Sequence, residues 1–290
     1  MAVVATAELV ARAAAEGGGV AAFNVITLEH AEAIVAGAER AGRPVILQIS
    51  ENAVRFHQRR LGPISLATRA VADAATVPVA LHLDHVESID LLYAAPAYGF
   101  GSAMFDASKL AYAENVAATR AAVGYGHRHG LWIESELGTI GGKEGEPPLS
   151  PHAPGARTDP EEAAEYVAAT GVDALAVAVG SSHAMTSREA RLDHELIARL
   201  GARVPVPLVL HGSSGVPDDE LSRAVAGGLR KVNIGTALNV AFTGAVRVGL
   251  DGTGLDPRTN VDPRKYLASA RDAVADTVVH FLGVVAAPRN

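Results

Sequence analysis

The sequence predicts an α/β fold of the (β/α)8, or TIM-barrel, class, formed as a single domain over residues 1–290. Two observations predict it: short apolar segments alternate with helix-like segments from end to end, and most of the short segments are continuously apolar. Continuous apolar runs are typical of parallel strands that are covered on both faces. A doubly wound sheet is the alternative, but it favours a glycine-rich phosphate turn after the first strand, and residues 23–27, FNVIT, are not one.

The apolar runs are expected to form the barrel strands, in the order Val20–Asn24, Pro44–Ser50, Pro78–Leu83, Ser102–Phe105, Leu131–Glu136, Ala174–Val179, Pro207–Leu210 and Lys231–Ile234. Between them, apolar residues at three- and four-residue spacing predict helices, as in Leu28–Ala41 and Leu110–His129. Eight strand–helix units in a chain of this length, with no linker between them, predict one barrel.

Helix start and stop signals agree with this order. Thr158 and Glu161 form a capping-box pattern, with Pro160 in the first turn. Pro217 is expected to open a later helix, which Gly227–Gly228 closes.

Three segments fall outside the strand–helix pattern. Residues 138–157, GTIGGKEGEPPLSPHAPGAR, are polar and rich in Gly and Pro, so we expect a long active-site loop there. A shorter polar segment, Glu51–Pro63, follows the second strand. A C-terminal helical extension begins at about residue 262, and we expect it to pack on a partner subunit.

Composition excludes several classes of protein. The chain has no cysteine, which excludes a disulfide framework, a thiolate nucleophile and a cysteine-based zinc site. Its net charge of -7 and its 4% aromatic content argue against nucleic acid, which rewards basic patches and stacking platforms. No apolar run approaches the length of a membrane span, and Met1–Arg12 lacks the signal-peptide pattern, so we expect a cytoplasmic protein that does not bind membranes.

Polar residues end every predicted strand, and in a barrel the C-terminal strand ends face the active site. These residues are Asn24, Ser50, Asp84, His85, Asp106, Glu134, Glu136, the run Gly180–His183, the run His211–Gly215, and Asn233 with Gly235 and Thr236. Solubility alone would favour lysines at such positions rather than three histidines and four carboxylates.

Three of the eleven histidines, His85, His183 and His211, occupy strand ends. Three neutral imidazoles that converge form an open ligand set for Zn²⁺ or a similar divalent ion. His82 shares a strand face with Asp84 but lies one layer deeper, so we interpret it as a hydrogen-bonded core residue. The remaining histidines fall on predicted helices or loops, where a surface or core role is the ordinary one: His30, His57, His127, His129, His152, His194 and His280.

Glycine and hydroxyl residues gather in the last three strand–helix loops. They are Gly180, Gly212, Gly215 and Gly235, interleaved with Ser181, Ser213, Ser214 and Thr236. Barrels commonly bind phosphate through backbone N–H groups and hydroxyls after the seventh and eighth strands. Turns use the same residue types, but the position beside the candidate metal ligands favours a phosphate site.

Motifs in the expected order cover nearly the whole chain: AFNVITLE (22–29), LHLDH (81–85), FDAS (105–108), ESELGTIGG (134–142), TDPEEA (158–163), TGVDALAVAVGSSH (170–183), LVLHGSSG (208–215), KVNIGT (231–236) and DPRKYL (262–267). They resemble the class II, metal-dependent fructose-bisphosphate and tagatose-bisphosphate aldolases. The resemblance implies reversible cleavage of a ketose 1,6-bisphosphate to dihydroxyacetone phosphate and an aldehyde, in carbohydrate metabolism such as glycolysis. It also implies a homodimer or homotetramer, a catalytic Zn²⁺ or other divalent ion, and a monovalent cation as a further candidate.

The resemblance also assigns site residues. His85, His183 and His211 look like the zinc ligands, with Asp106 and Glu136 as acidic residues near the metal or alternative ligands. Asp84 resembles the acid/base that moves the proton on the aldehyde-derived oxygen. Glu144 resembles the acid/base for the dihydroxyacetone C–H proton, and Asn233 the residue that holds the enediolate. The expected phosphate and substrate contacts are Asn24, Ser50, Gly180, Gly212, Ser214, Thr236 and Arg264, the last often across a subunit interface.

The lysine count helps to decide between two routes for aldol cleavage. A metal can polarise the ketone, whereas the other route needs a lysine Schiff base. The chain has four lysines: Lys109, Lys143, Lys231 and Lys265. We expect Lys231 at the start of its strand, at the wrong end of the barrel, and no lysine at a strand end, which favours the metal route.

Four residues depart from the pattern of the relatives: Val86, Lys143, Ala184 and Gly235. Gly235 stands where one fructose-bisphosphate branch has Asp, so the choice between fructose, tagatose and another ketose phosphate stays open. A non-catalytic sugar-phosphate-binding homologue is the third alternative. It is disfavoured because Asp84, Glu144 and Asn233 are all present.

Overall fold

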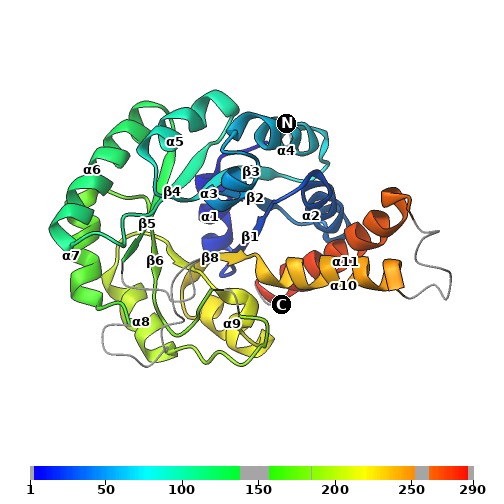
Figure 1. The fold of residues 1–290 in the computed structure, drawn as a ribbon. Coiled ribbons are helices and arrows are strands. Elements are labelled where there is room, and N and C mark those ends of the chain that lie inside the picture. The colour runs from blue at the N-terminus through cyan, green and yellow to red at the C-terminus, as the bar shows by residue number, and fades with distance from the viewer. Residues whose placement is uncertain (1–2, 138–156, 184, 252–260, 287–290) are drawn as a thin grey trace.

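The computed structural model describes residues 3–137, 157–183, 185–251 and 261–286. Parallel strands close into a barrel in chain order, with β8 pairing back onto β1 (Figure 1). Their bounds are β1 Val20–Asn24, β2 Val45–Ser50, β3 Val79–Val86, β4 Ser102–Phe105, β5 Trp132–Leu137, β6 Ala174–Val177, β7 Leu208–Leu210 and β8 Leu229–Ile234. The predicted (β/α)8 fold is confirmed, and each predicted strand overlaps an observed one.

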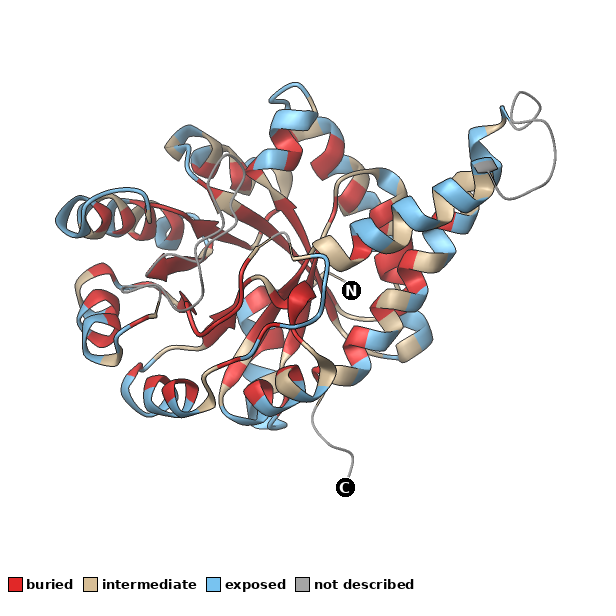
Figure 2. Cartoon of the chain, turned by 60° about the horizontal axis from the view of Figure 1, so that its bottom comes forward, coloured by how far each residue is buried: buried red, intermediate tan, exposed pale blue. Residues whose placement is uncertain are grey.

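Most helices form an outer ring around the barrel, whereas α1 covers its N-terminal end (Figure 1). Their bounds are α1 Thr6–Ala15, α2 Leu28–Ala41, α3 Glu51–Phe56, α4 Leu61–Ala74, α5 Ile89–Ala94, α6 Tyr112–Arg128, α7 Pro160–Thr170, α8 His194–Arg203, α9 Asp218–Ala226, α10 Thr236–Asp251 and α11 Pro263–Val284, with 3-10 turns η1 Ala95–Tyr98 and η2 Ser213–Gly215. Helix α11 packs against α2 and α10, and the distal ends of α10 and α11 project from the side of the barrel (Figures 1 and 2).

The barrel interior is layered along its axis. At the N-terminal end the inward side chains are apolar, among them Ala22, Ile46 and Ala80, and α1 packs on them through Leu9 and Val10. The larger apolar core lies between the outer face of the sheet and the helices, which expose their outward faces to solvent (Figure 2). Above the apolar plug, the next inward layer is polar: Gln48, His82, Ser102, Glu134 and Lys231 are all fully buried. The strands therefore carry buried charge directly beneath the C-terminal end.

The polar segment Glu51–Pro63 contains regular structure that its composition did not predict. Helix α3 occupies its first half, and the Ser50 hydroxyl caps it by accepting a hydrogen bond from Ala53 N at 3.2 Å. The helix was missed because it is short and because its polar side chains make contacts over the strand ends, so it lacks the usual apolar spacing of a helix. Glu51 is 9% exposed and accepts hydrogen bonds from the N–H groups of Glu87 and Ser88.

The capping box predicted at Thr158 is wrong. Asp159 is the N-cap of α7, and its carboxylate accepts from Glu161 N and Glu162 N at 2.9 and 3.0 Å. The Thr158 hydroxyl instead donates to Leu137 O and accepts from Ala178 N, so it ties β5 to the end of β6. The Ser/Thr-x-x-Glu pattern is satisfied one residue late because Asp is an equally good cap.

The other predicted boundaries hold. Pro217 is the N-cap of α9 and Gly227 its C-cap. His82 is a buried core residue that hydrogen-bonds Ser102 Oγ at 2.8 Å, as predicted. Within the described part of the chain, no helix has the length and apolarity needed to cross a bilayer.

His30 should make the stability of the protein depend on pH. Its ring is 4% exposed and stacks on Phe242 of α10 with centroids 4.7 Å apart. Burial lowers the pKa of His30 from 6.5 to about 4. The unfolded chain therefore binds the extra proton between these values, so the stability is complete above about pH 6.5 and is lost as the pH falls toward 4. We expect the His30 contribution to unfolding free energy to fall by about 2 kcal/mol between pH 7.5 and 5.0.

Urea unfolding of the wild type and His30→Gln at both pH values measures this contribution as the difference between their pH dependences. Equal pH dependence in the two proteins would contradict the prediction.

Candidate metal centre and active site

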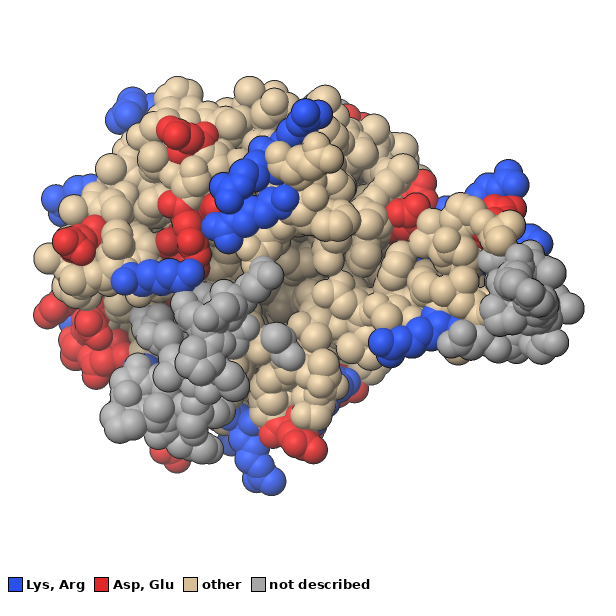
Figure 3. All heavy atoms as spheres, in the orientation of Figure 1, with Lys and Arg blue, Asp and Glu red and all other residues tan. Residues whose placement is uncertain are grey.

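The C-terminal ends of the strands open into a pocket of about 510 Å³. Most of the predicted site residues line it: Asn24, Ser50, Asp84, His85, Asp106, His183, Gly212, Ser214, Asn233 and Thr236. Glu136 and His211 are fully buried and touch the same cluster. The space-filling view shows the hollow with Lys and Arg side chains along its upper rim (Figure 3), and Arg55 and Lys109 line the pocket.

Three histidines and one carboxylate converge beside this pocket. One ligand atom from each of His85, Glu136, His183 and His211 lies within 4.8 Å of the others. The ring centroid of His85 is 5.0 Å from that of His183 and 4.8 Å from that of His211. The residues come from β3, β5 and the segments after β6 and β7, so the closed barrel brings together positions that are far apart in sequence.

A break in β3 directs two consecutive residues toward the pocket. Successive strand residues normally point to opposite faces, yet Asp84 and His85 both line the pocket. His85 has φ of 48°, in the left-handed region, and the pairing of β3 with β4 shifts register between Leu83 and Val86. A non-glycine residue in such a conformation costs about 1–3 kcal/mol and is typical of functional sites.

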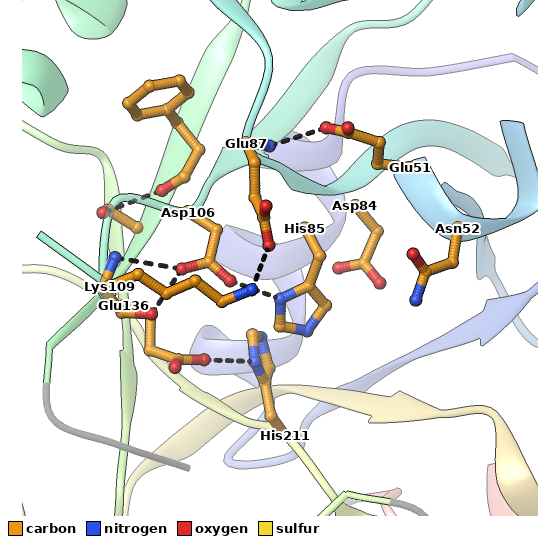
Figure 4. Close-up of polar contacts among 12 residues, drawn as sticks. Glu51, Asn52, Asp84, His85, Glu87, Asp106, Lys109, Glu136 and His211 are labelled. Atoms are coloured by element: carbon orange, nitrogen blue, oxygen red, sulfur yellow. Dashed lines mark hydrogen bonds and ion pairs between the residues drawn. The ribbon is translucent and has the colours of Figure 1, made fainter. Parts of the chain in front are cut away.

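Carboxylates hold two of the clustered imidazoles (Figure 4). His85 Nδ1 is 3.0 Å from Asp106 Oδ2. His211 lies between two glutamates, with Nδ1 at 3.0 Å from Glu136 and Nε2 at 2.9 Å from Glu134. Burial opposes the charged form of His211, but its hydrogen bonds to Glu134 and Glu136 raise its pKa to about 9. The imidazoles are thus fixed in orientation by carboxylates, as metal-ligating histidines usually are.

The prediction that Lys231 lies at the start of its strand, at the end of the barrel away from the active site, is wrong. Strand β8 begins two residues earlier than predicted, so Lys231 sits mid-strand with its side chain fully buried in the interior. Its Nζ lies 2.8 Å from Glu134 Oε2 and donates to Asn233 Oδ1 at 2.7 Å. Burial disfavours the charged form of Glu134, but the Lys231 charge lowers the Glu134 pKa well below its ordinary value. Lys231 is not among the residues that line the pocket.

Amide side chains surround Asp84. Gln48 Nε2 donates to Asn24 Oδ1 at 2.7 Å and lies 3.5 Å from Asp84 Oδ2. Asn233 Nδ2 lies 3.4 Å from Asp84 Oδ1. Asp84 is only 2% exposed, so its carboxylate faces the pocket from a nearly dry position.

The loops after β7 and β8 form a cradle suited to an anion. Gly212 has φ of 65°, and a Cβ there would meet the backbone of Ser182 at 2.5 Å, so only glycine lets the two loops approach. Ser214 Oγ accepts from Ala237 N in the first turn of α10, and Thr236 begins that helix at the pocket. A helix N-terminus with free N–H groups favours a bound phosphate.

Two predicted site residues do not line the pocket, and a third lies outside the part of the chain that the structure describes. Gly180 is in the loop after β6, with φ of 122°, but does not line the pocket. Arg264 begins α11, its side chain is 89% exposed, and it pairs with Asp262 at 2.9 Å. Glu144 lies outside the described residues.

The four departures divide in the same way. Lys143 and Ala184 lie outside the described residues. Val86 is fully buried, and its carbonyl accepts from Asp106 N at 2.9 Å. Gly235 lines the pocket, and a Cβ there would lie 3.0 Å from Asn24 Oδ1, so a side chain at this position would press on Asn24.

The sequence-based site omitted Gln48 and Lys231, and it included Glu134 only as a polar strand-end residue without an assigned role. The strand period of two was the available signal, because Gln48 precedes Ser50 by two residues and Glu134 precedes Glu136 by two. Each therefore shares the inward face one layer below a predicted site residue.

The donor set fits a divalent ion of the zinc type. Imidazole and carboxylate groups are the ligands that Zn²⁺ and similar ions take in catalytic sites, with a position left open for water or substrate. The clustered histidines supply the candidate ligand atoms. The carboxylates of Asp106 and Glu134 orient two of these imidazoles.

A parallel eight-stranded barrel with such a cluster at its C-terminal end defines a (β/α)8 enzyme with a candidate metal centre. Residues 4–288 match the profile of the family described as fructose-bisphosphate aldolase class-II. The chain is 39% identical over 262 residues to the fructose-bisphosphate aldolase of Geobacillus stearothermophilus, covering 89% of this chain and 88% of the relative. It is 37% identical over 279 residues to the enzyme so named in Staphylococcus aureus, with 96% and 95% covered.

The crystal structure of the YdjI aldolase from Escherichia coli K12 superposes with a TM-score of 0.84 at 31% identity, covering 98% of each chain. The chain belongs to the class-II fructose-bisphosphate aldolase family, and the protein is an aldolase, a carbon–carbon lyase.

Proposed function

We propose that the protein is a zinc-dependent aldolase that reversibly cleaves a ketose 1,6-bisphosphate, of fructose or tagatose, to dihydroxyacetone phosphate and an aldehyde phosphate. One observation carries the proposal: ligand atoms of His85, Glu136, His183 and His211 gather within 4.8 Å of one another, at a pocket that Asp84 and Asn233 also line. This arrangement supports the proposal, because three imidazoles, two carboxylates and an amide lie around one pocket.

His85, His183 and His211 would hold the ion, and Glu136 is an alternative ligand. Asp106 binds Nδ1 of His85 and so leaves Nε2 as the donor. Glu134 binds Nε2 of His211 and leaves Nδ1, on the side of Glu136. A divalent ion there would supply Lewis acidity that stabilises negative charge on the substrate ketone oxygen. Zinc suits three imidazoles, although cobalt, iron or manganese also accept them. A monovalent cation in the same site stays a prediction from the family resemblance.

Asp84 would be the acid/base at the aldehyde-derived oxygen. In cleavage its carboxylate accepts the proton of the hydroxyl on the carbon that becomes the aldehyde. The carbon–carbon bond breaks, and its electron pair stays on the dihydroxyacetone half as an enediolate. A positioned carboxylate contributes about 10²–10⁴-fold to such a step. Asp84 is nearly buried, so water competes little for that proton.

Asn233 would donate its amide hydrogens to an enediolate oxygen, since its Nδ2 faces Asp84 and the pocket. Gly212, Ser214 and Thr236 would hold the phosphate of the dihydroxyacetone half at the start of α10, with Gly180 shaping the neighbouring loop. Asn24 would help to orient substrate hydroxyls from the opposite wall.

Glu144 would return a proton to the carbon of the enediolate, and this role rests on the family resemblance alone. Arg264 would bind the second phosphate, with Ser50 as a helper. Because Arg264 lies in the first turn of α11, at the distal end of the projecting pair α10–α11, we propose that it serves a neighbouring subunit of a homodimer or homotetramer. Exposed apolar side chains on α10, Val240 at 53% and Val248 at 70%, support contact with a partner there.

We also propose that the enzyme works in the cytoplasm as a single barrel domain over residues 1–290, with residues 138–157 as its active-site loop. A bisphosphate carries several charges and does not cross a bilayer unaided, so the compartment of the enzyme is that of its substrate. A different ketose phosphate is the second candidate for the reaction. Gly235 favours it, because the pocket has no side chain at this position.

Cleavage assays on fructose and tagatose 1,6-bisphosphates, with and without chelator, test the proposal. Coupled detection of dihydroxyacetone phosphate should show turnover of at least one bisphosphate. A chelator should abolish it, and metal analysis should find about one divalent ion per chain. Turnover of singly phosphorylated ketoses alone would move the assignment to the second candidate. Full turnover by metal-free protein would overturn the metal route.

A further inference from the structure

We propose that Lys231 is a positioning residue that fixes which end of the Asn233 carboxamide faces the substrate. This inference rests on the proposed function, because Asn233 matters through the charge it would stabilise during aldol cleavage. Lys231 does not line the pocket and is fully buried, so any effect on the substrate passes through the residues that it contacts.

The hydrogen bonds of Asn233 define the orientation of its carboxamide. Among the described residues, its side chain has two partners on opposite ends. Lys231 Nζ donates to Oδ1 at 2.7 Å, while Nδ2 lies 3.4 Å from Asp84 Oδ1. A lysine ammonium has donors only, whereas a carboxamide has an acceptor at one end and donors at the other. Oδ1 must therefore turn down toward Lys231, and the NH₂ group must turn up toward Asp84 and the pocket.

Rotation of this carboxamide by half a turn would reverse its effect. Oδ1 would then face the Asp84 carboxylate and any developing negative charge on the substrate, as one acceptor against another. A donor aimed at developing charge is worth about 10²–10³-fold in rate, and it must be oriented before the reaction to contribute. The 3.4 Å contact with Asp84 is long for a hydrogen bond. The shorter bond to Lys231 thus contributes most to the orientation.

Stability does not account for this lysine. Its ion pair with Glu134, at 2.8 Å, lies fully buried inside the barrel. Replacing a buried ion pair by well-packed apolar residues is often neutral or stabilising. The apolar layer beneath, with Ile46 and Ala80, shows that this barrel can fill its interior without charge. The charge is better explained by the polar groups that it orients on the layer above.

The ion pair also places the ammonium. Glu134 binds Lys231 through Oε2 and His211 through Oε1. One carboxylate therefore contacts both a candidate metal ligand and the lysine that binds Asn233. Loss of Lys231 could therefore act through Asn233 or through His211. The two routes differ in their readouts, because only the second changes metal binding.

Side-chain NMR tests the orientation without metal or substrate. Selective ¹⁵N-asparagine labelling gives side-chain amide signals from seven asparagines, and the Asn233 pair is the one lost in Asn233→Ala. We expect Lys231→Met to shift this pair and to raise its hydrogen exchange with solvent. Unchanged Asn233 signals in Lys231→Met would overturn the proposal. This arm decides the question even if wild-type protein cleaves no ketose phosphate, an outcome that would remove only the proposed function.

Kinetics test the consequence. We expect Lys231→Met to lower kcat about 10²-fold, with KM within about threefold and metal content unchanged. On the Asn233→Ala background, Lys231→Met should cause no further loss, because residues acting as one unit are not additive. Ile34→Ala, a fully buried change in α2, controls for lost stability. Additive losses, or a fall in metal content that matches the loss of kcat, would overturn the route through Asn233.

Removal of Lys231 leaves Glu134 charged and buried, which can prevent folding. The charge-neutral pair Glu134→Gln/Lys231→Met then replaces the single variant in the NMR experiment. Its reference is Glu134→Gln alone, which keeps the lysine beside Asn233. A shift of the Asn233 signals in the pair but not in the reference supports the proposal, and equal spectra would reject it.

Discussion

Replacing His211 with alanine should abolish both metal binding and aldolase turnover. His211 is fully buried, with one ring nitrogen on Glu136 and the other on Glu134. Its loss removes an imidazole donor from the cluster and leaves two buried carboxylates facing an empty space. A bound metal stabilises the transition state by several kcal/mol, so we expect kcat to fall by at least about 10³-fold. Metal analysis and the coupled cleavage assay measure the two losses together.

His280→Ala is the matched control, because His280 is about half exposed and pairs with Asp218 on the protein surface. It should keep metal and activity. The metal route would fail if His211→Ala kept turnover in the presence of chelator. Because Lys231 proved to be an interior amine, borohydride treatment of the wild type with substrate is a necessary companion. Covalent trapping at Lys231 would restore the Schiff-base route that its paired and buried position disfavours.

Replacing Asp84 with asparagine should separate the two proton transfers of the reaction. Asp84 is assigned to the hydroxyl proton of the aldehyde half and Glu144 to the C–H proton of dihydroxyacetone phosphate. We therefore expect Asp84→Asn to lower kcat for cleavage by about 10²–10⁴-fold. Exchange of the C–H proton of dihydroxyacetone phosphate with D₂O, followed by NMR, should persist. Metal content should stay unchanged, since Asp84 is not among the clustered ligand groups.

The outcome of the exchange experiment is decisive for this assignment. Loss of exchange together with cleavage, at normal metal content, would mean that Asp84 serves both protons. Glu144→Gln offers the reciprocal variant and should lose exchange. The asparagine substitution keeps the size of the side chain beside Gln48 and Asn233, so the pocket is disturbed little.

The strands were predictable because a strand that is buried on both faces has a continuous apolar sequence. Val20–Asn24 and Ser102–Phe105 match the structure residue for residue, since nothing but a buried strand needs so continuous an apolar run. Helix α3 was not predictable in this way, because its polar residues serve contacts across the strand ends. Glu51, for example, accepts from two backbone N–H groups beyond β3. Local sequence does not contain such long-range partners.

The candidate site was predictable at its surface and not beneath it. Strand ends marked Asp84, His85 and His211, because polar residues there have no other common explanation. The supporting layer was hidden because a charge in the middle of a strand resembles an exposed edge position. Lys231 is the clearest example, since two residues of error at the start of β8 placed it at the N-terminal end of the barrel.

Helix α10 connects the substrate pocket to the projecting surface where we propose that a partner subunit binds. It begins with Thr236 at the pocket and runs sixteen residues into the projecting pair of helices, about 24 Å along its axis. A helix of this length behaves as a stiff rod, and α11 braces it along its side. We therefore expect a displacement of the far end along the axis to be passed to the phosphate cradle. Contact with a partner subunit at the projecting end would thus be linked mechanically to the substrate pocket of the same chain.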